Sequence, residues 1–214
     1  MFLDRLTYRK KAFGYYLLGS FIIIVFNQIG QIPLIFAIPT DIVLEPDSNP
    51  MDILKSIPSN LRLFLILLSS LITVPGIWLV VTKLHELSFK TIVTMRKKVD
   101  YNRIIFSFLL WGSVVTAFVI IGYFISPENY ELNFKLKEFL ILSVIAIFLI
   151  PVQTTVEELV FRGYLMQGFG GLFNSRLIGL LFTSIIFGGL HLLNPEVEAL
   201  GYLIMVQYLA YGFV

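Results

Sequence analysis

The sequence predicts an all-α fold, a polytopic transmembrane helix bundle of five spans plus an incomplete sixth. Of its 214 residues, 57% are hydrophobic and only 14% are charged. The mean hydropathy is +0.85. A soluble domain carries about 45–50% apolar and about 25% charged residues. This composition argues against a soluble enzyme, a nucleic-acid binder and a disordered protein, and makes the lipid bilayer the expected partner.

The expected spans are the runs without charged residues, because about 20 apolar residues cross roughly 30 Å of hydrocarbon. We expect the first run to be a retained span, since it is too long for a signal peptide and lacks a small-residue cleavage site. The chain shows no linker, so residues 1–214 are expected to form a single membrane-embedded domain. The runs are Ala12–Thr40, Leu63–Thr82, Ile104–Pro127, Phe139–Val156, Leu177–Leu190 and a stretch from about Ala199 to Val214.

The distribution of basic residues predicts the orientation of these spans, because cytoplasmic loops are enriched in Lys and Arg. Twelve of the 16 basic residues lie in the N-terminal tail, in the loop from Lys83 to Arg103 and in the segment after the fourth run. The other loops hold four. We expect an integral protein of a bacterial plasma membrane with its N-terminus in the cytoplasm.

Three charged residues follow the fourth apolar run, at Glu157, Glu158 and Arg162. An ionised side chain at mid-membrane costs about 2.5–3.5 kcal/mol, so a chain rarely retains three without a use. Glu158 and Arg162 are four residues apart and can pair on one helix face. Glu157 is turned about 100° away, and is a candidate general base.

Alternatively, the fourth span ends here and the charged side chains reach water at the headgroups. The apolar pattern continues beyond them, however, as far as the glycines that begin at Gly168. We therefore expect one helix from Phe139 to about Gly168, with the glutamates in its inner half.

The fifth run ends at a second polar position, His191, four residues after Phe187. A lone histidine there is more often an interfacial or core residue than a catalyst. Gly188 and Gly189 would permit close helix approach, which would turn His191 toward another helix.

A third polar group, Asn27, Gln28 and Gln31, lies inside the first run. Asn27 and Gln31 are four residues apart, and interhelical hydrogen bonding is their expected role.

The segment His85–Phe89 begins like the zinc-protease motif HExxH, but Phe89 stands where the second histidine belongs. The chain has two histidines and no cysteine, whereas catalytic zinc usually has three protein ligands. We therefore expect His85 to be a solvated loop residue. No cofactor is expected. The sequence does not rule out a divalent metal such as zinc, but no residue pattern in it supports one.

The pattern Glu157-Glu158-x-x-x-Arg162-Gly163, followed by Phe187-x-x-x-His191, resembles the EExxxR and FxxxH motifs of the CPBP family. These are the CAAX proteases and bacteriocin-processing enzymes, also called the Abi family, and they carry the two motifs on successive transmembrane helices. The similarity extends over about Leu61 to Val214, with its core at residues 139–214.

This resemblance implies a catalytic cavity within the bilayer and hydrolysis of a peptide bond in a membrane-associated peptide or protein. By analogy, Glu157 assisted by His191 would activate a water molecule. Glu158 and Arg162 would orient the site, and Phe187 would shape it. The family was described as metalloproteases, but a metal-free glutamate mechanism is favoured for its CAAX-processing members, and the shortage of histidines suits it.

The family's third motif, a histidine followed four residues later by Asn or Asp, is missing after His191. Its side chains would stabilise the tetrahedral oxyanion, an effect often worth about 3–4 kcal/mol per donor. We expect either a chain truncated within its sixth span, which the apolar end favours, or a natural short form, and reduced activity in both cases.

The sequence is also compatible with two other functions. One is a non-catalytic membrane protein on the same scaffold, such as a bacteriocin immunity or assembly factor. The other is a small transporter that uses Glu157, Glu158 and Arg162 as an ion or proton site. The depth of Glu157 relative to His191 and the oligomeric state do not follow from the sequence.

Overall fold

A computed structural model describes residues 13–39, 50–94, 99–192, 194, 197 and 201–213. Every regular element in these residues is helical, which confirms the all-α fold. The basic N-terminal tail and the start of the sixth run at Ala199 lie outside the described residues. Four helical stretches are long and apolar enough to cross a membrane, and two shorter apolar helices follow them: Phe13–Phe36, Ser59–Leu84, Tyr101–Ile125 and Leu136–Leu172, then Arg176–Leu190 and Ile204–Phe213.

The helices divide into two compact units. The smaller unit, residues 96–140, contains α6 (Tyr101–Ile125) and the 3-10 turn Pro127–Asn129. The Asp100 side chain caps α6 by accepting a hydrogen bond from the backbone N–H of Arg103. α6 has no buried residue, as expected of an apolar helix that contacts lipid. The larger unit carries all five site residues predicted from the sequence.

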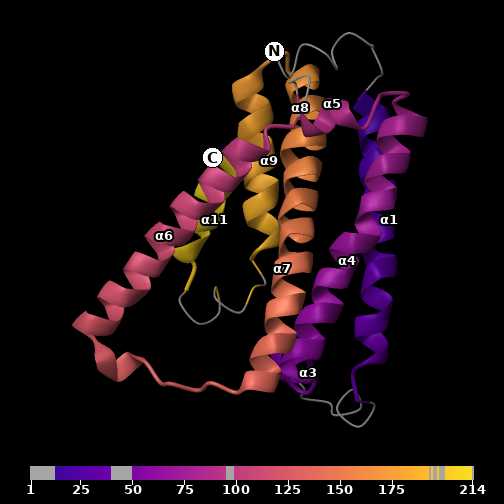
Figure 1. Ribbon diagram of the computed structural model, residues 1–214. Helices are drawn as coiled ribbons and strands as arrows, with labels where there is room; N and C mark the ends of the chain where they lie inside the picture. Colours follow the sequence, from indigo (N-terminus) through magenta and orange to yellow (C-terminus); the bar gives the residue numbers. More distant parts are fainter. Residues whose placement is uncertain are drawn as a thin grey trace. The chain divides into compact units, whose positions relative to one another are not determined.

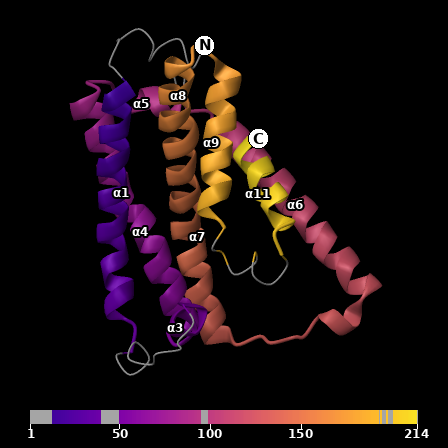
Figure 2. The same cartoon turned by 180° about the vertical axis from the view of Figure 1, so that it is seen from behind.

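In the larger unit, α1 (Phe13–Phe36) and α4 (Ser59–Leu79) lie side by side, with the short α3 (Pro50–Lys55) preceding α4 (Figures 1 and 2). The helices approach closely at Gly30, where a Cβ would come within 2.5 Å of the Ser69 Cα. Asn27 Nδ2 donates to Thr73 Oγ1 at 3.2 Å, and Gln31 Nε2 donates to Asn27 Oδ1 at 3.0 Å. The predicted interhelical hydrogen bonding in the first span is therefore confirmed.

The buried core of this unit lies where α1 and α4 meet the helix that carries the two glutamates. α4 passes directly into a π-helical turn, η2 (Val80–Leu84), which is followed by the short α5 (Lys90–Val93). The apolar core residues pack against one another and hold α1 and α4 against the helix that carries the two glutamates. The core residues are Ile23, Ile77, Val80, Val81, Ile92, Val156, Leu159 and Tyr164.

The helix of the first motif runs without interruption through α7 (Leu136–Glu158), the π-helical turn η4 (Leu159–Leu165) and α8 (Met166–Leu172). The prediction that the helix continues past the glutamates is confirmed, although it ends at Leu172 rather than near Gly168. The π-helical turn was not predicted. π-Helical turns are rare in proteins, and those that occur are often found at functional sites.

α8 is followed by a tight turn and then by α9 (Arg176–Leu190), which returns alongside it (Figure 1). Ser175 caps α9 by accepting a hydrogen bond from the backbone N–H of Ile178. The two helices pack closely, because a Cβ at Gly179 would lie 2.8 Å from the Met166 carbonyl oxygen and 2.9 Å from the Gly170 nitrogen.

α11 (Ile204–Phe213) packs against α9. A Cβ at Gly188 would lie 2.8 Å from the Leu209 side chain, whereas one at Gly189 would meet nothing within 4 Å. The close approach expected at the glycine pair therefore occurs at Gly188 alone.

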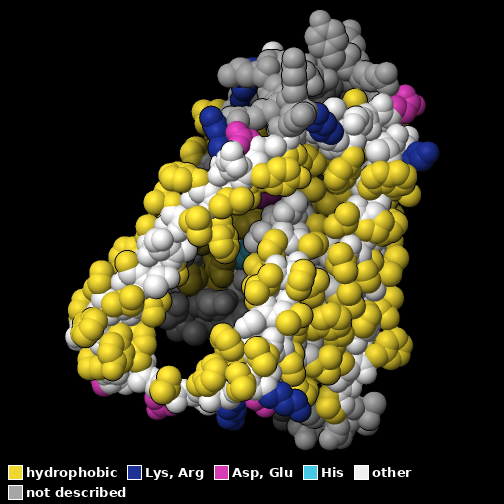
Figure 3. Space-filling view, viewed as in Figure 1, with side chains coloured by type: hydrophobic (Ala, Val, Ile, Leu, Met, Phe, Trp, Pro, Cys, Tyr) yellow, Lys and Arg dark blue, Asp and Glu magenta, His cyan; other side chains and the backbone are white. Residues whose placement is uncertain are grey.

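The surface over α1 and α4 is almost entirely hydrophobic along the length of the helices, and charged side chains gather at their two ends (Figure 3). This distribution is the one expected of helices whose sides face hydrocarbon and whose ends reach the headgroups.

Candidate active site

The α8–α9 hairpin brings the two predicted motifs to the same level of the bundle. Glu157 lies 15 residues before Leu172 at the end of α8, and His191 lies 15 residues after Arg176 at the start of α9. With the α-helical rise of about 1.5 Å per residue, the second interval corresponds to about 22 Å, and the first, which includes the π-helical turn, has the same number of residues. Because the hairpin folds back at a three-residue turn, arms of the same number of residues return His191 to about the depth of Glu157.

Glu157 is half-buried near the end of α7. Gln153, one turn earlier, donates from Nε2 to Glu157 Oε1 at 2.5 Å. His191 and Glu158 both act on the Glu157 carboxyl electrostatically. Glu157 and His191, which are 34 positions apart in the sequence, therefore lie within range of an electrostatic interaction.

Glu158 and Arg162 form the pair that their spacing predicts, with Arg162 Nη1 2.7 Å from Glu158 Oε1. The Glu158 side chain is 59% exposed, whereas that of Arg162 is only 20% exposed. The second guanidinium nitrogen of Arg162 donates to the carbonyl oxygens of Tyr211 at 2.5 Å and Gly212 at 3.2 Å. Arg162 thus binds the carbonyl end of α11, where a cation also complements the helix dipole.

His191 ends α9 and lies among aromatic rings. Its Nδ1 is 2.7 Å from the carbonyl oxygen of Phe187. Because a carbonyl only accepts, Nδ1 carries the proton, and in the neutral ring Nε2 is left as an acceptor. The ring centroid lies 4.5 Å from that of Phe187 and 4.5 Å from that of Tyr208, with interplanar angles of 40° and 24°.

Phe187 is buried, and its ring makes an edge contact with Phe161 at 5.2 Å between centroids. It therefore joins the helix of the first motif to the histidine of the second. Tyr208, and Asn194, which donates to the Tyr208 hydroxyl at 3.3 Å, were not predicted from the sequence. A single tyrosine in an apolar run carries no signal that separates it from lipid-facing or core aromatics.

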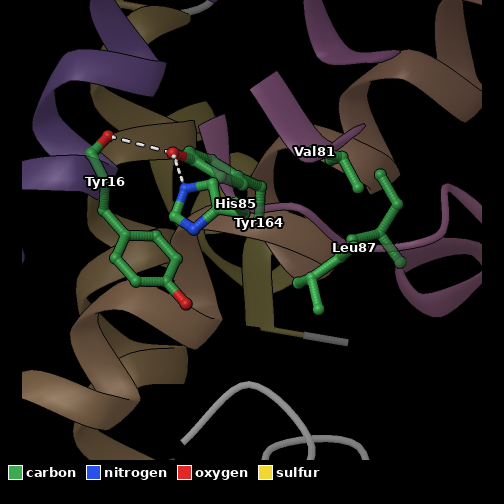
Figure 4. Close-up of a pocket in the computed structure, with 6 residues that line it drawn as sticks. Tyr16, Val81, His85, Leu87 and Tyr164 are labelled. Carbon is green, nitrogen blue, oxygen red and sulfur yellow. Dashed lines mark hydrogen bonds between the residues drawn. The ribbon is translucent and has the colours of Figure 1, made fainter. Parts of the chain in front are cut away.

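His85 is not the solvated loop residue that the sequence predicts. It is only 5% exposed, at the end of η2, and its Nε2 lies 2.9 Å from the Tyr164 hydroxyl. The hydroxyl also contacts the backbone carbonyls of Tyr15 and Tyr16 at 3.3 and 3.4 Å. Figure 4 shows the hydroxyl between the His85 ring and the Tyr16 carbonyl. The prediction of a solvated His85 is wrong because the π-helical turn η2 places the His85 ring in the core, although charged residues lie near it in the sequence.

The pocket at this cluster is small and includes none of the five predicted site residues. It is lined by Tyr16, Val81, His85, Leu87, Ile92 and Tyr164. Among the described residues, no three or more His, Cys, Asp or Glu side chains are grouped so that they could hold a metal ion.

Comparisons with known proteins agree with the motif pattern. A family model described as "Type II CAAX prenyl endopeptidase Rce1-like" matches residues 136–214. The uncharacterized protein YyaK of Bacillus subtilis (strain 168) is 31% identical over 202 residues, which cover 93% of this chain and 67% of that protein. No solved structure matches the chain.

Proposed function

Because the chain belongs to the CPBP family, whose Rce1-like members are CAAX prenyl endopeptidases, we propose that it is an intramembrane endopeptidase. Its reaction would be hydrolysis of a peptide bond in a membrane-associated peptide or protein of a bacterial plasma membrane. One observation carries the proposal: the hairpin holds the Glu157 carboxyl within electrostatic range of the His191 ring, among helices long and apolar enough to span a membrane.

In this reaction, Glu157 is the general base. It takes a proton from a water molecule as the water oxygen bonds to the scissile carbonyl carbon. The proton then passes to the nitrogen of the leaving amine as the carbon–nitrogen bond breaks. This order leaves a carboxylic acid and an amine, and returns Glu157 to its starting state; the acid then gives up the second proton of the water to solvent or to the amine and becomes a carboxylate.

His191 assists by holding the water. Its Nδ1 donates to the Phe187 carbonyl, so its Nε2 is free to accept a hydrogen bond from the water that Glu157 deprotonates. Gln153 donates to one oxygen of Glu157 and thereby restricts the orientation of the carboxylate. The proposed reaction needs no metal, so a chelator is expected to leave the rate unchanged.

Arg162 and Phe187 support the site without contacting the reacting atoms. Arg162 binds Glu158 on its own helix and the last carbonyls of α11, which joins the first motif to the following helix. Phe187 packs between Phe161 and His191. Both contacts fix the position of one half of the site against the other.

The test is cleavage of a fluorescent farnesylated CAAX peptide, and of a panel of membrane-anchored peptides, by the full-length protein in liposomes. Glu157→Gln keeps the shape and the Gln153 contact but removes the base, so we expect a loss of about 10²–10⁴-fold. Glu131→Gln, on an exposed residue of the smaller unit, is the matched control and should cleave like the wild type.

Equal cleavage by Glu157→Gln and the wild type would contradict the proposal. A wild-type protein that cleaves none of these substrates, with a cellular phenotype that survives Glu157→Gln, would instead identify a non-catalytic membrane protein.

A further inference from the structure

The Nδ1 hydrogen bond to Phe187 and the ring contacts together define the orientation of the His191 ring. The hydrogen bond by itself fixes one atom of the ring. The ring of Tyr208 stacks on that of His191, with centroids 4.5 Å apart and an angle of 24° between the ring planes, which is closer to parallel than the 40° between His191 and Phe187. Offset stacking of this kind contributes beyond the area it buries.

Tyr208 is itself held in place from two directions. Asn194, which follows His191 by three positions, donates to its hydroxyl at 3.3 Å. Its helix, α11, is bound by Arg162 through the carbonyls of Tyr211 and Gly212, about one turn further along. The chain of contacts thus runs from Arg162 of the first motif through α11 to the ring of the second-motif histidine.

We propose that Tyr208 is a positioning residue, which by stacking on His191 keeps the imidazole in one orientation with Nε2 directed to the water at Glu157. The consequence for catalysis rests on the proposed function, whereas the orientation of the ring does not. The stacking ring is the essential part, and the hydroxyl, at 3.3 Å from its partner, is secondary.

The reason is the freedom of the ring about its terminal torsion, which is broad for histidine. Without a flat neighbour, the ring can turn away and leave Nε2 misplaced relative to the carboxylate. A displacement of about 1 Å in a catalytic group can lower the rate about 10²-fold, with little effect on substrate binding. Loss of the stack should therefore appear in kcat rather than in KM.

The first experiment measures the tautomer and the mobility of the His191 ring by NMR and needs no substrate. Because the chain has two histidines, ¹⁵N-histidine labelling gives two sets of ring signals, and the buried His85 serves as the internal reference. We expect the wild type and Tyr208→Phe to show one Nδ1-protonated form of His191. Tyr208→Leu should show a mixture of tautomers or exchange broadening. An unchanged His191 spectrum in Tyr208→Leu would overturn the proposal.

The second experiment measures cleavage by the same variants of the full-length protein. We expect Tyr208→Phe to stay close to the wild type and Tyr208→Leu to lose about ten-fold in kcat with KM unchanged. Tyr202→Leu, on a 78% exposed tyrosine before α11, controls for a general loss of stability. Equal loss in the Phe and Leu variants, or a change in KM alone, would overturn the role of stacking.

The two experiments test the proposed endopeptidase function and the positioning role of Tyr208 independently. If the wild type shows no Glu157-dependent cleavage, the proposed function fails, and the histidine spectra still decide whether Tyr208 orients the ring.

Discussion

His85 Nε2 lies 2.9 Å from the hydroxyl of Tyr164, and both side chains are buried, at 5% and 2% exposed. The two residues belong to different parts of the chain, since His85 lies outside residues 136–214, which the family model matches, and Tyr164 lies inside them. Tyr164 also follows Arg162 by two positions in the π-helical turn. The bond therefore ties the N-terminal helices to the turn that carries the first motif.

Replacing Tyr164 by Phe should destabilise the protein. The substitution keeps the ring but leaves His85 without this buried partner, which costs about 1–3 kcal/mol. Thermal unfolding in detergent should show a lower midpoint than for the wild type. Tyr101→Phe, at a 69% exposed position, should not change it. Equal midpoints for Tyr164→Phe and Tyr101→Phe would show that the bond contributes nothing.

Arg162→Lys should loosen α11. A lysine ammonium cannot reproduce the forked geometry with which Arg162 binds Glu158 and the carbonyls of Tyr211 and Gly212. Hydrogen exchange of the backbone amides in residues 204–213 should become faster by a factor of about ten or more, corresponding to about 1.5–3 kcal/mol for bonds to a charged donor.

Glu158→Gln is the matched comparison for Arg162→Lys. Its side chain is 59% exposed, so breaking the ion pair alone should cost less than about 1 kcal/mol and leave α11 almost as protected as in the wild type. Equal exchange rates in the two variants would show that the carbonyl contacts do not hold α11.

The close packing of α8 on α9 predicts that Gly179→Ala destabilises the hairpin. The added Cβ would meet backbone atoms of Met166 and Gly170 at 2.8 and 2.9 Å, so the helices must move apart, at a cost of about 1–3 kcal/mol. Gly171→Ala, with nothing within 4 Å of the added atom, should be neutral or slightly stabilising. Differential thermal unfolding checks both, and identical midpoints would refute the packing argument.

Orientation in the membrane can be tested because the chain has no cysteine. We expect Ser88→Cys, in the basic loop after α4, to react with an impermeant maleimide only from the cytoplasmic side. Asn129→Cys, after α6, should react only from the opposite side. Both positions are exposed, and both should react after permeabilisation. The reverse pattern would invert the predicted topology.

Four long apolar helices and two of the polar contacts could be predicted from the sequence because they depend on local patterns. Uncharged runs mark the membrane helices, and four-residue spacing places Glu158 beside Arg162 and Gln31 beside Asn27. These relations need only the geometry of a single helix.

Other features depend on how helices meet, and a single sequence does not encode that in a short motif. His85 lies next to Lys83 and Glu86, so its segment looks solvated, and only the π-helical turn places the ring in the core. Tyr208 stacks on His191 because α11 packs against α9, and neither helix shows this in its own pattern. The same holds for the bond between Arg162 and the end of α11.

The two arms of the α8–α9 hairpin, from Glu157 to Leu172 and from Arg176 to His191, span the same number of residues, and the number in each arm sets the depth of its site residue. Removing one residue from either arm would shift one of the two groups, Glu157 or His191, by about 1.5 Å along the axis and rotate it by about 100°. Insertions and deletions in related chains should therefore fall in the turn at 173–175 or outside the stretch from Glu157 to His191. A lengthened arm would be tolerated only where the other arm has grown by the same amount.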